Sequence, residues 1–377
     1  MYDVLCVMYD VMKDKQPKAR VLAYYLPQFH PIPENDLWWG KGHTDWKNVG
    51  KAKPLFPGHY QPRVPADLGY YDLRVPETRE AQAEMARENG IEGFVYWHYW
   101  FGNGKQILER PFNEVLASGK PDFPFALGWA NETWSSTMHG LRKGKKLFEQ
   151  LYPGDEDYKA HFMSVLPAFK DHRYVTCEDK PIFIVYLPEN HPEMKHFIEY
   201  WRDLAVQNGL KGIYFIALSI SRWSEQDTTD FYERMMNLGF DGVVFENMQP
   251  PRTTIPFIKR TFFKFMRSCF HWPLLFYYND KYFAPELCWH KDNVFPTVIP
   301  NWDHTPRSGS RGSVMIGSSP EKFQKTMHSM VEKVQYKPAD KRFIFIKSWN
   351  EWGEGNYLEP DLRYGHAWLD ALKNEVL

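Results

Sequence analysis

The sequence predicts an α/β protein folded as a closed (β/α)8 TIM barrel with elaborated loops after its strands. Eight short apolar segments alternate along the chain with segments of helical spacing, which is typical of parallel strands joined by helices. The number eight matches a closed barrel. No Gly-x-Gly-x-x-Gly stands between a strand and a helix, so an open, doubly wound nucleotide-binding sheet is the second choice.

The expected strands are rich in β-branched and aromatic residues and end at Pro, Gly or polar residues. In chain order they span 20–26, 93–98, 125–129, 181–186, 213–219, 242–245, 294–299 and 342–347. The expected helices span 76–89, 155–170, 191–208, 227–238 and 320–336. The first helix begins at Pro76 and is followed by Gly90, residues that are typical of a helix start and a helix end.

Two segments depart from this alternation. The segment 27–75 is rich in Pro, Gly and Trp and is too long to serve only as a connection. The segment 250–291 predicts a helical insertion between the sixth and seventh strands, with the composition of a basic amphipathic helix. That helix either packs on the barrel as an ordinary insertion or contacts an anionic membrane, or a lipid-linked glycan, through 252–270. We expect an N-terminal extension over 1–19 and a single catalytic domain over 20–377.

The composition excludes some classes of function. The chain has 46 Lys and Arg against 47 Asp and Glu, a net charge of −1, which excludes a protein that coats nucleic acid through bulk charge. The aromatic content is 17%, with 15 Trp, 22 Tyr and 27 Phe. A core alone rarely needs so much Trp and Tyr, because both carry a polar atom that requires a partner when buried.

Neither a cofactor nor a metal is expected. The four cysteines are far apart, and the acidic residues 155–157 fall in the first turn of an expected helix, where carboxylates are common. The first 20 residues carry Asp3, Asp10 and Asp14 where a signal peptide would be apolar, and no apolar stretch is long enough for a membrane span. We therefore expect a cytoplasmic protein, with membrane association through the insertion as the alternative.

Polar and aromatic residues gather where the expected strands end, which is where barrel enzymes place their active sites. Carboxylates and amides among indole rings suit a sugar, since a sugar ring has hydroxyl groups at its edge and an apolar face that stacks on aromatic planes. Each of these side chains could equally have a structural role. The predicted substrate-binding residues are Gln28, His30, Trp97, His98, Tyr99, Trp129, Asn131, Glu132, Glu246, Asn301, Trp302, Asn350 and Trp352.

Glu351 and Glu354 follow the eighth strand and are the predicted catalytic pair. Cleaving a glycosidic bond requires one carboxyl group to protonate the leaving oxygen and a second to act across the reacting centre. A turn at Gly353 and Gly355 would bring both carboxyl groups to one side, with Trp349 and Trp352 beside them. The spacing fits equally well two glutamates that favour the positive end of a following helix.

Several motifs carry a resemblance to a known family. They lie at 23–36 (AYYLPQFHPIPEND), 38–42 (WWGKG), 59–62 (HYQP), 96–100 (YWHYW), 129–132 (WANE) and 349–355 (WNEWGEG). Over about 21–372 the chain resembles the bacterial WbsX-type proteins, usually labelled as lipopolysaccharide-biosynthesis glycosyltransferases. These in turn resemble glycoside hydrolase family 99, the endo-α-mannosidases, which are barrels.

The resemblance implies roles for the two glutamates. The hydrolases retain anomeric configuration through the sugar's own 2-hydroxyl group, so that Glu351 would be the base and Glu354 the acid. Gly353 stands where the hydrolases have His, so mannose specificity does not carry over. We expect an enzyme that acts at a glycosidic bond of a bacterial surface polysaccharide by hydrolysis or transglycosylation. The alternatives are a lipopolysaccharide or O-antigen glycosyltransferase and an inactive glycan-binding barrel; none of the three implies nucleic acid as a partner.

Overall fold

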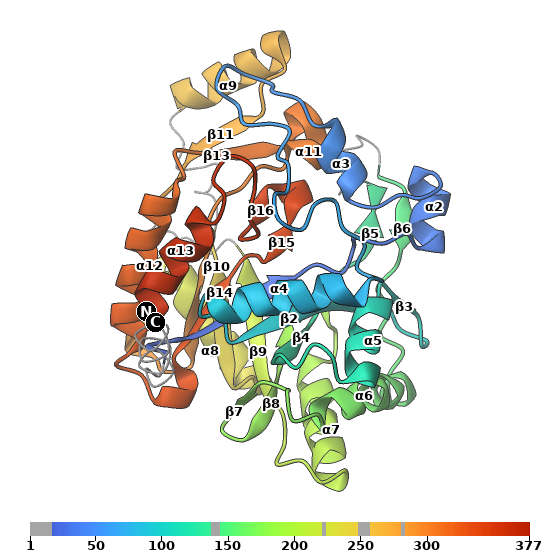
Figure 1. The fold of residues 1–377 in the computed structure, drawn as a ribbon. Coiled ribbons are helices and arrows are strands. Elements are labelled where there is room, and N and C mark those ends of the chain that lie inside the picture. Colours follow the sequence, from blue (N-terminus) through green and yellow to red (C-terminus); the bar gives the residue numbers. More distant parts are fainter. Residues whose placement is uncertain (1–16, 137–143, 221–223, 248–256, 280–282) are drawn as a thin grey trace, which may run out of the picture.

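The computed structural model describes residues 17–136, 144–220, 224–247, 257–279 and 283–377. Its centre is a barrel of parallel strands (Figure 1). These are β1 (Arg20–Tyr25), β2 (Gly93–Trp100), β4 (Phe125–Trp129), β8 (Lys180–Val185), β9 (Tyr214–Ile220), β10 (Gly242–Glu246), β12 (Val294–Val298) and β14 (Phe343–Ile346). Strand β1 pairs with both β14 and β2, which closes the sheet. The predicted closed barrel is confirmed, and the open doubly wound sheet is wrong.

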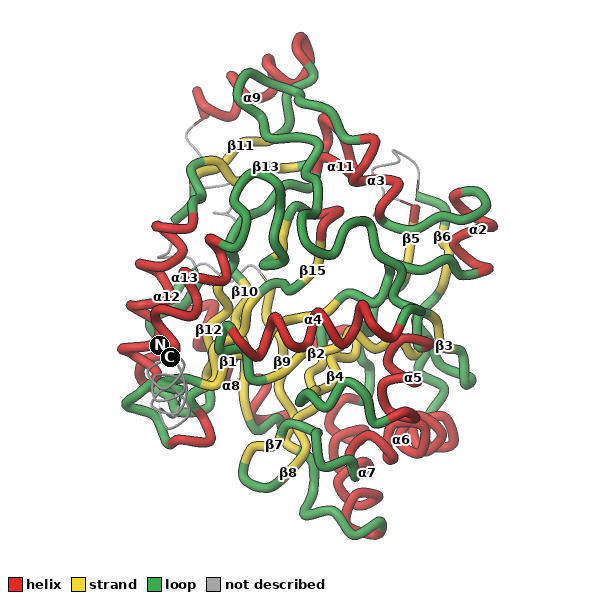
Figure 2. Tube along the Cα trace, viewed as in Figure 1, coloured by secondary structure: helices red, strands yellow, loops and turns green. Residues whose placement is uncertain are grey.

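Helices surround the barrel on its outer face (Figure 2). They are α4 (Pro76–Glu88), α5 (Arg110–Ser118), α6 (Asp155–Phe169), α7 (Met194–Gln207), α8 (Glu225–Leu238), α10 (Leu287–His290), α12 (Pro320–Val334) and α13 (Ala367–Val376). A further helix, α9 (Phe257–Phe270), lies away from the barrel at the top of Figure 2. Helix α7 begins three residues later than predicted, because a 3-10 turn over Pro188–Asn190 and then Pro192 precede it. The N–H of Lys18 bonds to the carbonyl of Val376 at 3.0 Å, so the two ends of the described chain lie together.

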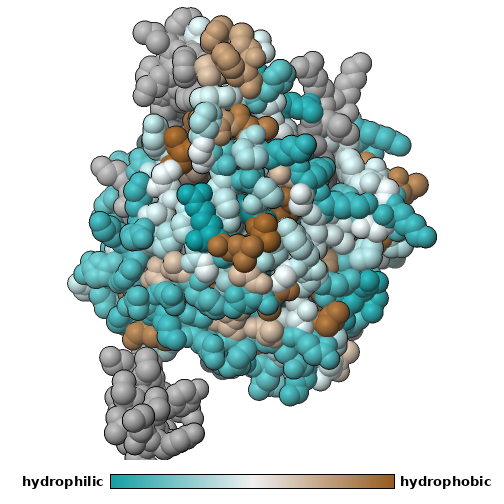
Figure 3. Space-filling model, turned by 45° about the horizontal axis from the view of Figure 1, so that its top comes forward, coloured by the Kyte–Doolittle hydropathy of each residue, from teal (hydrophilic) through white to brown (hydrophobic). Residues whose placement is uncertain are grey.

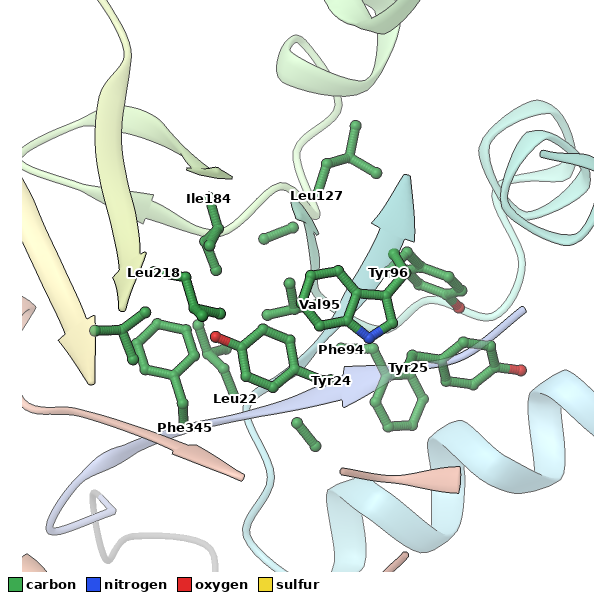
Figure 4. Packing of buried hydrophobic residues seen from close by; sticks show 14 of the residues in the cluster. Leu22, Tyr24, Tyr25, Phe94, Val95, Tyr96, Leu127, Ile184, Leu218 and Phe345 are labelled. Atoms are coloured by element: carbon green, nitrogen blue, oxygen red, sulfur yellow. The ribbon is translucent and has the colours of Figure 1, made fainter. Parts of the chain in front are cut away.

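Alternation along the strands decides which side chains face the barrel axis (Figure 4). Tyr24 points inward and stacks on Trp97, with ring centroids 4.8 Å apart. Its neighbour Tyr25 points outward, and its hydroxyl donates to Gln82 of α4 at 2.6 Å. Both rings are buried, so part of the aromatic excess belongs to the core and to the layer between barrel and helices.

Additional elements extend mainly from the carboxyl ends of the strands. The long loop after β1 contains α2 (Pro33–Trp39) and α3 (Trp46–Lys51). The remaining short elements are β3 (Gln106–Ile107), β5 (Trp134–Ser135), β6 (Lys146–Phe148), β7 (Thr176–Cys177), α11 (Thr305–Ser308), β15 (Asn350–Glu351) and β16 (Asn356–Tyr357), with 3-10 turns η5 (Gly309–Arg311), η6 (Ala339–Lys341) and η7 (Trp352–Glu354). The predicted elaboration of the loops is thereby confirmed.

The insertion between β10 and β12 lies at the top of Figure 1. It contains α9, then β11 (Leu274–Tyr277) and α10, and β11 pairs in parallel with β13 (Ser313–Ile316). The predicted helical insertion is confirmed, whereas strand β11 was not expected. Of the basic-aromatic segment, 252–256 lies outside the described residues, as does 1–16 of the expected N-terminal extension.

Some apolar side chains of the insertion face solvent. Phe265 is 55% exposed and Phe270 57%. Apolar residues gather at this end of the molecule in Figure 3. Within the described ranges, no helix combines the length and apolarity required to traverse a bilayer.

Candidate active site

A pocket of about 100 Å³ opens at the carboxyl ends of the barrel strands. Because these ends meet at one face of the barrel, loops that are distant in sequence all contribute to it. Its lining consists of Leu26, Gln28, Trp97, Tyr99, Ala130, Glu132, Trp134, Ser135, Leu147, Tyr186, Arg307, Lys347, Glu351 and Glu354. Three carboxyl groups, two cations and several aromatic rings therefore share one small space.

The turn η7 brings Glu351 and Glu354 to the same side. The hydroxyl of Ser348 accepts the N–H of Glu351 at 2.9 Å, and the carbonyl of Glu354 accepts the N–H of Asp303 at 2.6 Å. Gly355 has a φ of +57°, and a Cβ there would lie 2.7 Å from the Cβ of Asp303, so only glycine fits. The backbone of the motif thus fixes the positions of both carboxyl groups.

The two carboxyl groups have different neighbours. Trp97 donates its indole N–H to Glu351 Oε1 at 3.2 Å. Glu354 Oε1 instead accepts from Arg307 Nη1 at 2.6 Å, and His304 Nε2 lies 3.7 Å from the same oxygen. One member of the pair therefore contacts a neutral donor, and the other contacts a permanent cation.

This difference separates their pKa values. Burial, and then the charge of Glu354, raise the pKa of Glu351 well above its ordinary value. Burial would also raise the pKa of Glu354, but the charge of Arg307, followed by those of Lys347 and His304, lowers it to about 2. The pKa values of the two carboxyl groups are thus shifted in opposite directions, which is the separation that an acid and a base acting together require.

Both cations are held by buried carboxylates. Arg307 Nη2 donates to Asp45 Oδ2 at 2.7 Å, and Asp45 is fully buried. Lys347 Nζ donates to Glu246 Oε1 at 2.6 Å inside the barrel. Burial opposes the charge of Lys347, but its neighbours Glu246, Glu351 and Glu354 raise its pKa, Glu246 most of all.

Glu132 is the third carboxyl group of the pocket. It follows β4, and it lines the same cavity as the pair. Burial and then the charge of Glu354 raise its pKa to about 7. Near neutral pH Glu132 can therefore either donate a hydrogen bond to a sugar hydroxyl group or accept one from it.

Six of the fifteen predicted site residues line this pocket, and nine do not line it as the described residues form it. The six are Gln28, Trp97, Tyr99, Glu132, Glu351 and Glu354. Strand β2 shows the reason for the division. Trp97 and Tyr99 alternate with His98, and a period of two turns every second side chain outward toward the helices.

Two of the other predicted residues, Asn131 and Asn350, join strand ends. The amide of Asn131 donates to the carbonyl of Leu187 and accepts its N–H, both at 2.8 Å. The amide of Asn350 makes the same pair of bonds to Leu26, at 3.1 and 2.8 Å. Leu26 itself lines the pocket, so Asn350 supports the pocket wall without facing the cavity.

The remaining predicted residues are buried in contacts around the pocket. Trp352 donates to Glu359 Oε2 at 2.6 Å and stacks on Tyr357. Trp302 donates to Ser313 Oγ at 3.1 Å, and Asn301 accepts from Arg63. Glu246 bonds to Lys347 as described above. His30 is 2% exposed, and burial lowers its pKa to about 4. Substrate contact by these residues stays a prediction.

His98 and Trp129 lie between the barrel and the helices. The Nε2 atoms of His98 and His161 are 2.8 Å apart, so one imidazole donates to the other. The indole N–H of Trp129 donates to the carbonyl of Trp100 at 3.0 Å, and its ring packs against His161 and Phe197. Burial lowers the pKa of His98 to about 4 and that of His161 well below its ordinary value.

We expect this histidine pair to make the fold sensitive to acid. Between about pH 6.5 and pH 4 the unfolded chain binds protons that the folded pair does not, so stability falls as the pH falls. The loss is up to about 1.4 kcal/mol per pH unit for each histidine. Urea unfolding of a His98→Phe, His161→Phe double variant at pH 7 and pH 5 should show a weaker pH dependence than the parent chain. His172→Gln, which replaces an exposed histidine, is the control. If the free energy of unfolding changes equally with pH in the parent chain and the double variant, the buried pair is not the cause of the acid sensitivity.

Sequence reasoning missed several pocket residues. Lys347 and Tyr186 are the last residues of two predicted strands, and counting the alternation to the strand end would have found them. Arg307 lies in the short helix α11, and its partner Asp45, outside the pocket lining, directly precedes α3; no periodicity in the sequence marks either residue. Across the described ranges, no three His, Cys, Asp or Glu side chains are grouped so as to hold a metal ion.

Comparison with known proteins places the chain in a family. The family model Glycosyltransferase WbsX matches residues 21–372. The chain belongs to the WbsX glycosyltransferase family. Two uncharacterized WxcX proteins from strains of Xanthomonas campestris pv. campestris are 37% and 36% identical to it over 361 and 359 residues. Each alignment covers 95% of this chain, which spans about half the length of these relatives (50%).

Solved structures share the fold of this WbsX family member. The GH99 endo-α-mannosidase from Bacteroides thetaiotaomicron superposes with a TM-score of 0.56 at 15% identity, covering 94% of this chain and 96% of that one. A glycoside hydrolase-like protein also has a TM-score of 0.56 and 15% identity, with 95% and 94% covered. At this identity the likeness shows the barrel fold, and the expected resemblance to family 99 is confirmed at that level.

Proposed function

We propose that this chain is a carbohydrate-active enzyme that acts at a glycosidic bond of a bacterial surface polysaccharide, with Glu351 and Glu354 as its catalytic pair. The observation that carries the proposal is one pocket holding two carboxyl groups whose pKa values are separated in opposite directions. Breaking a glycosidic bond requires a proton donor and a carboxylate at the same time. Retaining hydrolysis or transglycosylation is the reaction that this arrangement supports.

The aromatic lining supports a sugar as the substrate. Trp97, Tyr99 and Trp134 present rings to the pocket, and Gln28 and Glu132 add hydrogen-bonding groups. Rings of this kind stack on the apolar face of a sugar, while amide and carboxyl groups bind its hydroxyl groups. The name of the family and the GH99 fold both favour a glycan over other substrates.

The test is to incubate the purified chain with the O-antigen or capsule oligosaccharide of the bacterium that encodes it. Mass spectrometry of the products separates three outcomes. Shorter or rearranged oligosaccharides support the proposal. Extension that depends on an activated donor, with release of nucleotide or polyprenyl phosphate, supports instead a glycosyltransferase, which is the alternative favoured by the family name. Binding without turnover indicates a glycan-binding barrel.

We also propose that α9 touches an anionic membrane and brings the pocket close to lipid-linked glycans. Within α9 the sequence contains Lys259, Arg260, Lys264 and Arg267 and no acidic residue. Among the described side chains, Phe265 and Phe270 are more than half exposed. A helix with exposed aromatic residues and only positive charge is typical of an interfacial membrane contact.

We expect the chain to co-sediment with vesicles containing phosphatidylglycerol and not with pure phosphatidylcholine. Arg267→Gln should lower the partition coefficient about fivefold, since one basic residue contributes about 1 kcal/mol at such a surface. Phe265→Ser should lower it as well, whereas Tyr336→Ser, at an aromatic residue that is 88% exposed on the loop after α12, should not. Equal binding to both vesicle types would contradict the membrane contact.

A further inference from the structure

The space beside Gly353 is occupied by a carboxylate from another loop. A Cβ built on Gly353 would lie 2.1 Å from Oδ2 of Asp45 and 2.6 Å from its Cγ. Asp45 immediately precedes α3 in the long loop after β1, and none of its surface is exposed. Because position 353 has no side chain, the Asp45 carboxylate can lie directly against the motif.

Asp45 fixes the plane of the Arg307 guanidinium. Arg307 Nη2 lies 2.7 Å from Oδ2 of Asp45 and Nε lies 3.3 Å from Oδ1, so two nitrogens of one edge meet both carboxylate oxygens. Asn48 also donates to Oδ1, at 2.9 Å, which holds the carboxylate from α3. A two-point contact of this kind orients a guanidinium more firmly than a single bond can.

The third nitrogen of Arg307 points at the catalytic pair. Nη1 donates to Glu354 Oε1 at 2.6 Å, and the Arg307 side chain is only 13% exposed. Arg307 thus connects Asp45, which lies outside the pocket, to Glu354, which lines it. The ion pair is shielded from water. Protonating Glu354 would therefore leave the buried Arg307 guanidinium with Asp45 as its remaining ionised partner, which costs free energy.

The other polar groups around Glu354 act in the same direction as Arg307. Lys347, His304 and a hydrogen bond with the Glu351 carboxyl group all favour its ionised form, against the effect of burial. Arg307 is the cation that hydrogen-bonds to the Glu354 side chain, from Nη1 to Oε1 at 2.6 Å. Glu351, by contrast, receives a neutral indole N–H. The geometry alone distinguishes the two glutamates.

We propose that Arg307 is a positioning residue that holds Glu354 as the carboxylate of the pair and leaves Glu351 as the proton donor. Arg307 does so while bonded to Asp45, whose carboxylate occupies the space beside Gly353. The inference rests on the proposed function and reverses the roles that the family resemblance implies.

In the first step Glu351 gives its proton to the glycosidic oxygen as the bond from that oxygen to C1 breaks. At the same time the oxygen of the sugar's own 2-hydroxyl group forms a bond to C1, and Glu354 accepts the proton of that hydroxyl group. In the second step an acceptor hydroxyl or water bonds to C1 and returns its proton to Glu351, while the first oxygen leaves C1 and recovers the proton from Glu354.

Carbon-13 NMR of the full chain labelled at the glutamate carboxyl carbon tests this directly and needs no sugar. Signals of the pair are assigned by their absence in Glu351→Gln and Glu354→Gln. We expect the titration midpoint of Glu354 to lie below about pH 4 and the midpoint of Glu351 to lie above about pH 4. Arg307→Gln should raise the titration midpoint of Glu354 by at least about one pH unit. Arg307→Lys should raise it less, since lysine keeps the charge but cannot bond to Asp45 and Glu354 together.

Arg311→Gln is the matched control, because Arg311 lies exposed on the adjacent turn η5 and should leave the Glu354 midpoint unchanged. If Arg307→Gln fails to fold, the Glu354 titration midpoint measured in Arg307→Lys tests the inference instead. A Glu354 midpoint at or above that of Glu351, or one that neither Arg307 variant moves, overturns the inference. Absence of polysaccharide turnover by the parent chain would instead overturn the proposed function, so the two failures are distinguishable.

Discussion

Glu354→Gln and Glu351→Gln should each lower turnover of the surface polysaccharide by about 10²- to 10⁴-fold, the range that a positioned acid or base contributes. Glutamine has the size of glutamate but can neither carry the negative charge nor release a proton at neutral pH. Because the backbone of β15 and of the turn η7 holds Glu351 and Glu354 in place, the substitutions should leave the pocket walls unchanged. The measurement is product formation by mass spectrometry, together with oligosaccharide binding by calorimetry, which should persist.

Glu189→Gln is the control for these variants. Glu189 lies on the loop after β8 with its side chain 42% exposed, outside the pocket lining, and its replacement should leave turnover unchanged. If Glu354→Gln transfers sugar from an activated donor as fast as the parent chain, the hydrolase-like mechanism is wrong for this protein. Unchanged hydrolysis in both pocket variants would remove the pair from the reaction altogether.

Gly353→Ala should destabilise the fold by about 3–5 kcal/mol, the cost of breaking a buried ion pair. The added methyl group would stand where the Asp45 carboxylate lies, 2.1 Å from Oδ2. Asp45 would have to turn away, lose its bonds to Arg307 and Asn48, and leave the Arg307 charge partly unpaired in the interior. Urea unfolding followed by circular dichroism measures the change in the free energy of unfolding.

Gly50→Ala is the control for this substitution, since Gly50 lies in α3 with open space around its Cβ position. Alanine there should be neutral or should stabilise the helix by up to about 1 kcal/mol. Combining Gly353→Ala with Asp45→Ser should cost less than the sum of the two single substitutions, because the clash disappears. Strict additivity would show that the two positions do not compete for space.

Much of the barrel could be predicted from sequence because its elements depend on local patterns. The eight strands agree with their predicted spans within a few residues, since short apolar runs between helical segments are typical of buried parallel strands. The composition of the insertion indicated its helix. The 3-10 turn before α7 and the pairing of β11 with β13 could not be predicted, because each depends on neighbours that are distant in sequence.

The candidate site was predictable only in part, and the reason differs from residue to residue. Glu351 and Glu354 stand in a motif with two glycines, which marks a turn with carboxyl groups at a strand end. His98 and Trp129 stand at strand ends as well, but alternation turns them toward the helices, where they pack with His161. A strand end identifies the face of the barrel that carries the site, and only the direction of each side chain identifies the residues that line it.

The sequence by itself determined the barrel, the end at which its polar residues gather and the pair of glutamates, because these follow from periodicity and from the spacing within one short motif. The tertiary structure alone decided which glutamate has the lowered pKa and which the raised one. That depends on Arg307, Asp45 and Lys347, which come from three segments far apart in the chain and meet at the pocket. Electrostatic interactions act through space and depend on distance and burial, and neither quantity is contained in the order of residues.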